Sequence, residues 1–207
     1  MGCNVGLFKS GESQTEEELE KRVLILGLDN AGKSSILYQI KDTEFKRMVP
    51  TIGLNVEQLK FKRFLITFWY TIYLVIFLRD VGGQATMLWR HYYTDTDAVI
   101  FVVDATNQDR VSSAKDELHK IVNEPQLEDC PLLIYANKID LPLKMTEDQI
   151  NKGLDLDSLK KKDKVLQFCS AKTNEGIWEG MEKLFSIVQT NLTSKNTGTT
   201  RSDGKSS

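Results

Sequence analysis

The sequence predicts an α/β domain whose mostly parallel β-sheet is covered by helices on both faces. Four short apolar runs with little polar alternation predict buried strands at residues 22–27, 97–104, 131–136 and 164–169. Apolar residues at helical spacing predict amphipathic helices around residues 36–40, 111–121 and 177–192. Strands that alternate with such helices are typical of parallel sheets, in which ligands bind at the carboxyl ends of the strands.

Composition narrows the function classes. A chain of 207 residues, 41% of them hydrophobic, is long enough for one buried core and short for two. The formal net charge of -2 provides no basic field, so we do not expect nucleic-acid binding. The three cysteines, Cys3, Cys130 and Cys169, favour a reducing compartment over a disulfide framework. The first residues lack the features of a secretory signal, so we expect the domain to face the cytosol.

Both ends of the chain are polar. Residues 1–19 form an acidic lead-in, and residues 193–207 contain no apolar residue. Burial cannot offset the entropy of ordering such segments, which predicts a disordered tail at 193–207 and a folded domain over residues 20–192. The most apolar stretch, residues 64–78, is shorter than the about 20 residues that a membrane-spanning helix needs. Its β-branched and aromatic content favours a strand.

A phosphate-binding loop follows the first predicted strand. Gly27, four further residues, Gly32, Lys33 and Ser34 match the Walker A pattern between a strand and a helix. Such a loop turns its amides inward around phosphate oxygens, Lys33 supplies charge to the terminal phosphates, and Ser34 is a hydroxyl ligand suited to Mg²⁺. The predicted nucleotide-binding residues of this segment are Gly27, Asp29, Asn30, Ala31, Gly32, Lys33, Ser34 and Ser35.

Two later segments predict the nucleotide base. In "NKID", Asp140 can accept two hydrogen bonds from N1 and the exocyclic N2 of guanine, a donor pair that adenine lacks. Asn137 is expected to tie this loop to the phosphate loop, and the stem of Lys138 to cover the ring. In "CSAK", Ser170, Ala171 and Lys172 follow another strand, where we expect a backbone amide to hold the O6 edge.

Together these segments resemble a Ras-type GTPase, and more narrowly the Arf and Arf-like family. "GLDNAGKSS", "PTIGLNVE", "DVGGQ", "LWRHYY", "TDAVIFVVDAT", "ANKIDLP" and "EGMEKL" are similar to that family's signature segments, over roughly residues 20–192. The resemblance implies a Ras-like P-loop G domain with a six-stranded sheet, GTP or GDP and Mg²⁺ as cofactors, and GTP hydrolysis.

The resemblance also assigns roles at the two switch segments. Thr51 would be the second hydroxyl on Mg²⁺, Asp80 would hold the ion through water, Gly83 would contact the γ-phosphate, and Gln84 would orient the attacking water. Loss of the γ-phosphate would release both segments at once. Since no internal arginine finger is assigned and Asp29 replaces a small residue, hydrolysis is expected to be slow and to need an activating protein.

The N-terminus predicts attachment to a membrane. Gly2 is a candidate for myristoylation, although Gly6 departs from the preferred Ser or Thr, and Cys3 could carry a second acyl chain. The alternative is an unmodified tail. The family resemblance implies an exchange factor, an activating protein and effectors or coat proteins as partners, in vesicle trafficking at the cytosolic face of membranes such as the Golgi.

One stretch departs from the family pattern. Tyr70–Arg79 separates Trp69 from Asp80, and its removal yields "LITFWDVGGQ", an ordinary family sequence. One hypothesis is a retained short intron, because codons for this stretch permit splice signals that rebuild the Trp codon. The other is a real insertion, in which residues 74–78 form the strand leading to Asp80 and residues 64–73 lengthen the preceding hairpin.

Three alternative functions remain at this stage. The first is a GTP-binding scaffold that does not cycle because the altered second switch, which is also shorter after Gln84, cannot place that glutamine. The second is a kinase using the same phosphate loop, against which "NKID" argues. The third is a transmembrane protein anchored by residues 64–78.

Overall fold

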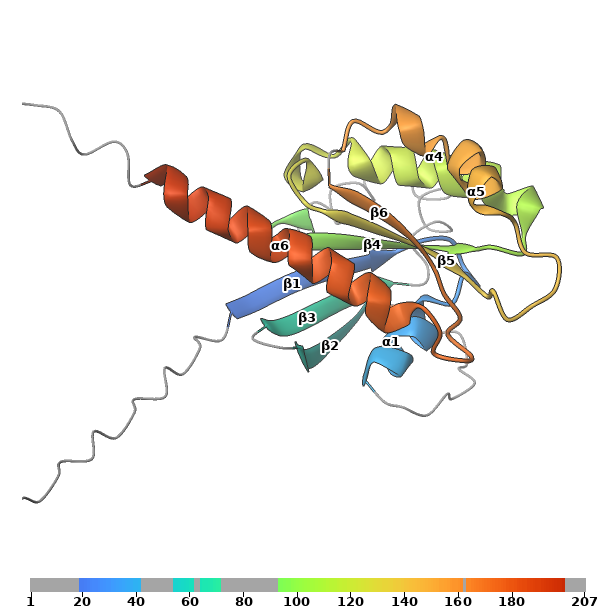
Figure 1. Ribbon diagram of the computed structural model, residues 1–207, viewed down its shortest axis with the longest axis horizontal. Helices are drawn as coiled ribbons and strands as arrows, with labels where there is room; N and C mark the ends of the chain where they lie inside the picture. The colour runs from blue at the N-terminus through green and yellow to red at the C-terminus, as the bar shows by residue number, and fades with distance from the viewer. Residues whose placement is uncertain (1–18, 42–53, 62–63, 72–92, 162, 200–207) are drawn as a thin grey trace, which may run out of the picture.

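The computed structural model describes residues 19–41, 54–61, 64–71, 93–161 and 163–199. Their core is a six-stranded sheet in the order β2-β3-β1-β4-β5-β6 (Figure 1). All neighbouring strands are parallel except β2 and β3, which form an antiparallel pair. The predicted mostly parallel, six-stranded α/β fold is thereby confirmed. The strands are β1 (Leu19–Leu26), β2 (Leu54–Phe61), β3 (Phe64–Thr71), β4 (Ala98–Asp104), β5 (Leu132–Asn137) and β6 (Lys164–Phe168).

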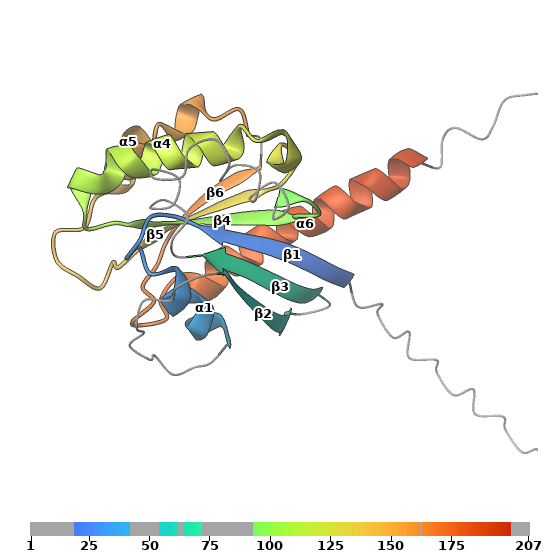
Figure 2. The same ribbon diagram turned by 180° about the vertical axis from the view of Figure 1, so that it is seen from behind.

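Helices cover both faces of the sheet. Figures 1 and 2 show α1 and α6 on one face and α4 and α5 on the other. The helices are α1 (Lys33–Lys41), α4 (Val111–Val122), α5 (Glu147–Leu154) and α6 (Ile177–Thr199), with short 3-10 turns η2 (Gln108–Arg110), η3 (Pro125–Leu127) and η4 (Leu156–Ser158).

Alternate residues of the central strands enter two separate cores. In β1, Val23 and Ile25 pack in the core under α1 and α6, whereas Leu24 and Leu26 pack in the core under α4 and α5. Side chains alternate between the faces of a strand, so a strand covered on both faces must be apolar at every position. This requirement explains why these strands were visible in the sequence as uninterrupted apolar runs.

The parallel arrangement gathers several loops at one edge of the sheet. β1, β4 and β5 end at Leu26, Asp104 and Asn137, and they are neighbours in the sheet. Their following loops therefore lie side by side at the carboxyl edge, where the predicted phosphate and base loops are found.

The position beside β1 is filled by β3. Trp69 pairs with Leu24 and Tyr70 with Ile25, and β3 continues to Thr71. The expectation that residues 74–78 form the strand at this place is wrong, because residues 64–71 combine β-forming side chains with a direct hairpin connection to β2. Residues 72–92, including most of the insertion, lie outside the described part.

Two element ends and one whole helix differ most from the sequence predictions. β1 begins at Leu19, and α5, which lacks a long apolar period, was not predicted. Its signal was a capping box, in which Thr146 and Gln149 satisfy each other's backbone amides. The tail predicted to be disordered from residue 193 is helical up to Thr199, because extending an existing helix costs far less than starting one. Residues 200–207 lie outside the described part.

None of the helices among the described residues has both the length and the apolar character to cross a membrane. Residues 64–71, the described half of the proposed anchor, form strand β3.

Gly180 of α6 provides a test of how closely this helix packs on the sheet. A Cβ there would lie 2.5 Å from Cε1 of Tyr135, which is fully buried and donates its hydroxyl hydrogen to the carbonyl of Ile177. Gly180→Ala should gain about 1 kcal/mol in helix propensity but lose about 1–3 kcal/mol through overpacking. We expect a net loss of about 1 kcal/mol in urea unfolding, whereas Ser186→Ala on the exposed side should change little. A stabilised Gly180→Ala protein would contradict the packing.

Candidate functional site

The phosphate loop folds around two glycines that no other residue can replace without strain. Gly27 has φ +136°, and a Cβ there would lie 2.2 Å from the carbonyl oxygen of Val102 in β4. Gly32 has φ +99°, and its Cβ would lie 2.2 Å from Nδ2 of Asn137. Both positions combine a positive φ with the close approach of another part of the molecule, the backbone of β4 at Gly27 and the side chain of Asn137 at Gly32. Only glycine tolerates this combination. The loop thus lies tightly against β4 and the base loop.

Lys33 is a buried cation at the end of this loop, where it is the first residue of α1. Its side chain is 3% exposed, and Nζ donates to the carbonyl oxygens of Gly27 and Leu28, both at 2.8 Å. Burial lowers the pKa of Lys33 to about 8, against the opposing effect of the Asp29 carboxylate. Among the described residues, this buried ammonium is hydrogen-bonded to neutral carbonyls and not to a carboxylate. Its charge is therefore not neutralised, and binding of an anion such as phosphate would be favourable.

Ser34 offers a hydroxyl that has no hydrogen-bond partner among the described residues. Its Oγ is nevertheless buried. An orphaned hydroxyl beside a phosphate loop fits an oxygen-seeking cation such as Mg²⁺. The other predicted metal ligands, Thr51 and Asp80, lie outside the described residues, as do Gly83, Gln84, Gly2 and Cys3. Within the described ranges, no cluster of three His, Cys, Asp or Glu side chains provides an alternative metal site.

Asn137 joins three loops through one buried side chain. Its Nδ2 donates to the carbonyl of Ala31 in the phosphate loop at 2.8 Å, and its Oδ1 accepts from the amide of Ala171 at 3.0 Å. Gln39 of α1 adds a bond from Nε2 to the carbonyl of Ala171 at 2.9 Å. The structure therefore brings the predicted phosphate and base segments together, as expected for Asn137.

Lys138 is anchored by a residue that sequence reasoning missed. It has φ +74°, and its Nζ lies 2.6 Å from Oδ2 of Asp104 at the end of β4. Burial alone would raise the pKa of Asp104, but hydrogen bonds from Lys138 and Thr106 outweigh it and hold the pKa below its ordinary value. This pair keeps the stem of Lys138 in place. The sequence does contain a signal for Asp104, because this aspartate is the polar residue that ends the apolar run of β4.

The carboxylate of Asp140 is fixed in position by two residues of the loop after β6, Ser170 and Lys172. Ser170 is fully buried and donates from Oγ to Oδ1 of Asp140 at 2.7 Å, and Nζ of Lys172 lies 3.9 Å from Oδ2. The amides of Ser170, Ala171 and Lys172 donate to Glu175, Asn137 and the Ser170 hydroxyl, respectively. An amide that bonds the O6 of a base must therefore share or exchange its present partner.

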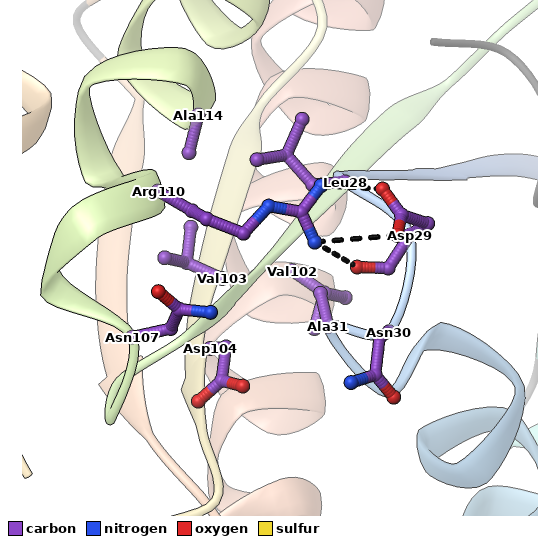
Figure 3. A pocket seen from close by; sticks show the side chains of 10 residues that line it. All are labelled: Leu28, Asp29, Asn30, Ala31, Val102, Val103, Asp104, Asn107, Arg110 and Ala114. Atoms are coloured by element: carbon purple, nitrogen blue, oxygen red, sulfur yellow. Dashed lines mark hydrogen bonds and ion pairs between the residues drawn. The ribbon is translucent and has the colours of Figure 1, made fainter. Parts of the chain in front are cut away.

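A second missed residue, Arg110 at the start of α4, reaches the phosphate loop. Its guanidinium donates to the backbone carbonyl and to both carboxylate oxygens of Asp29. The pair lines a small cavity, shown in Figure 3, together with apolar residues such as Val102 and polar residues such as Asp104. The cavity has a volume of about 20 Å³. The spacing of Arg110 from the phosphate loop in sequence gave no signal for this contact.

The buried Lys33 predicts a pH dependence of stability. Its pKa is about 8 in the folded chain and 10.5 as the ordinary value. Between pH 8 and pH 10.5, Lys33 is still protonated in the unfolded chain but largely neutral in the folded chain. The free energy of unfolding therefore rises with pH in this range, because the folded chain no longer buries a charged ammonium. Relative to Lys33→Met, the nucleotide-free protein should gain about 2–3 kcal/mol from pH 7 to pH 10 in urea unfolding. An equal pH profile in both proteins would contradict the burial of a charged Lys33.

The bridging role of Asn137 predicts a large loss on truncation. Asn137→Ala leaves the carbonyl of Ala31 and the amide of Ala171 without these partners in a buried place, which should cost about 2–4 kcal/mol in unfolding experiments on the nucleotide-free protein. Asn151→Ala, at a partly exposed position of α5, serves as the control and should cost less than about 1 kcal/mol. Equal losses in the two variants would show that the bridge contributes little.

Comparisons with known proteins agree with this geometry. The family model of the ADP-ribosylation factor (Arf) family matches residues 8–188. The structure of the Arl6 (BBS3) small GTPase from Trypanosoma brucei, with a bound nucleotide analogue GppNp, superposes with a TM-score of 0.68 at 28% sequence identity. The superposition covers 82% of this chain and 98% of that chain. Because the family match spans most of the sequence and the solved structure shares the fold, this chain belongs to the Arf family of small GTPases, which bind and hydrolyse GTP.

Proposed function

We propose that the chain is a Mg²⁺-dependent GTP switch that recruits effectors or coat proteins to membranes during vesicle trafficking. The observation that supports it best is the Asn137 bridge, which holds the loop expected to bind phosphates against the loop expected to select the base. A site that reads both ends of one ligand discriminates far better than either loop alone. The related GTPase with bound GppNp supports a triphosphate as that ligand.

The proposed site is divided between phosphate, base and metal. The phosphate loop residues 27–35 and Gly83 bind phosphates, and Asn137, Lys138, Asp140 and residues 170–172 bind guanine. Ser34 and Thr51 would supply hydroxyl ligands to Mg²⁺, and Asp80 would hold the ion through water. Two described features support this division: the buried Ser34 hydroxyl, which has no hydrogen-bond partner among the described residues, and the Lys33 ammonium bonded to loop carbonyls.

Hydrolysis is proposed to be slow, with Gln84 orienting water and an activating protein supplying positive charge. The register of β3 bears on this step, because Tyr70 already pairs with Ile25 and Asp80 follows much later in the chain. That spacing is the observation that favours the alternative of a scaffold that binds GTP without cycling. Single-turnover hydrolysis with and without an Arf-activating protein separates the two functions: acceleration supports the switch and its absence supports the scaffold.

The membrane role is proposed from the N-terminal sequence. Acylation of Gly2, with Cys3 as a second site, would place the chain on the cytosolic face of membranes such as the Golgi. Exchange of GDP for GTP by an exchange factor would then control recruitment. The net charge of -2 supports protein partners rather than nucleic acid.

Guanine selectivity provides the decisive experiment. Purified protein with Mg²⁺ should bind GDP and GTP strongly and ATP weakly, as measured by fluorescent-nucleotide titration. Asp140→Asn should weaken GDP and GTP binding by about 100-fold, because the carboxylate pairs with two guanine donors. The exposed Asp148→Asn is the matched control and should bind like the wild type. Equal affinity for ATP and GTP in the wild type would refute the proposal.

A further inference from the structure

A carboxylate in a phosphate loop poses an electrostatic problem. Asp29 lies between the loop's first glycine and Lys33, whose Nζ is 2.8 Å from the carbonyl oxygen of Leu28, the residue before Asp29. A negative charge at this place repels a terminal phosphate and competes for the same ammonium. Something in the structure must offset it if the loop is to accept a triphosphate.

Arg110 is placed to offset this charge. Its guanidinium points from the end of η2 towards the phosphate loop, and it contacts Asp29 three times (Figure 3). The bond from Nη1 to the Asp29 carbonyl is 3.0 Å long, and the carboxylate is bonded through both oxygens. A fork of this kind fixes the direction of the carboxylate as well as neutralising it, which a lysine could not do equally well.

The surroundings of the pair favour an electrostatic role over a stabilising one. The side chains of Arg110 and Asp29 are 39% and 42% exposed, so solvent screens the attraction and little folding stability is expected from it. The pair nevertheless acts on the buried Lys33: Asp29 raises the pKa of Lys33, and Arg110 lowers it. The two charges therefore act on Lys33 in opposite directions, and removal of Arg110 alone would leave the effect of Asp29 unopposed by Arg110.

We propose that Arg110 is a positioning residue that neutralises Asp29 and thereby sets the preference of the phosphate loop for GTP over GDP. The inference rests on the proposed nucleotide site. Without Arg110, Asp29 would repel the additional charge of the γ-phosphate and draw on the ammonium of Lys33. GDP carries no phosphate at that position and would be affected less.

The test compares the affinities of GppNp and GDP with Mg²⁺ by titration calorimetry. Arg110→Gln keeps the side-chain stem but loses the charge, and it should shift the GppNp-to-GDP affinity ratio by about tenfold towards GDP. The double variant Asp29→Asn, Arg110→Gln removes both charges and should restore the ratio to within about threefold of the wild type. Recovery of this kind is not expected if Arg110 merely supports the fold.

A matched control lies nearby on α4, which follows Arg110 directly. Lys115 of α4 pairs with Asp155 at 3.0 Å, with side-chain exposures of 38% and 42%. Lys115→Gln should leave the affinity ratio unchanged. The proposal is overturned if Arg110→Gln also leaves the ratio unchanged, if it weakens both nucleotides equally, or if the double variant shows no recovery. A wild-type protein that binds neither nucleotide would instead refute the proposed function.

Discussion

The buried side chain of Asn137 is the contact on which the site depends. It is 1% exposed and bonds both the phosphate loop, through Ala31, and the loop after β6, through Ala171. A buried amide that loses one partner retains its desolvation cost, so the bonds strongly favour the arrangement in which all three loops are docked. Gly32 also approaches this side chain so closely that a Cβ at position 32 would clash with it, so the phosphate loop lies directly against Asn137.

The parallel sheet makes that contact possible. Because β1, β4 and β5 are neighbours and point the same way, their loops leave the sheet at one edge with no long connection to order. The two apolar cores fix the strands on which these loops stand. Asp104 at the end of β4 pairs with Lys138, and Arg110 at the end of η2 pairs with Asp29, so residues outside the phosphate and base loops also set the charges of the site.

Local sequence predicted those parts of the protein whose determinants are local. Buried strands need apolar residues at every position, and the glycines of the phosphate loop follow from backbone geometry, so both were visible. The α5 helix depends on a cap and not on a long apolar period, and the helical extension to Thr199 depends on an existing helix. Asp104 and Arg110 could not be assigned, because their partners are brought close only by the fold.

Hydrogen exchange on GDP binding tests most directly whether the loops form one unit. Amides of residues 27–35 and of residues 137–140 and 169–172 should gain protection together at the same GDP concentration, because Asn137 couples them. In Asn137→Ala the two regions should respond separately. Protection confined to the phosphate loop in the wild-type protein, with no change around Asp140 and Ala171, would contradict a shared guanine nucleotide site.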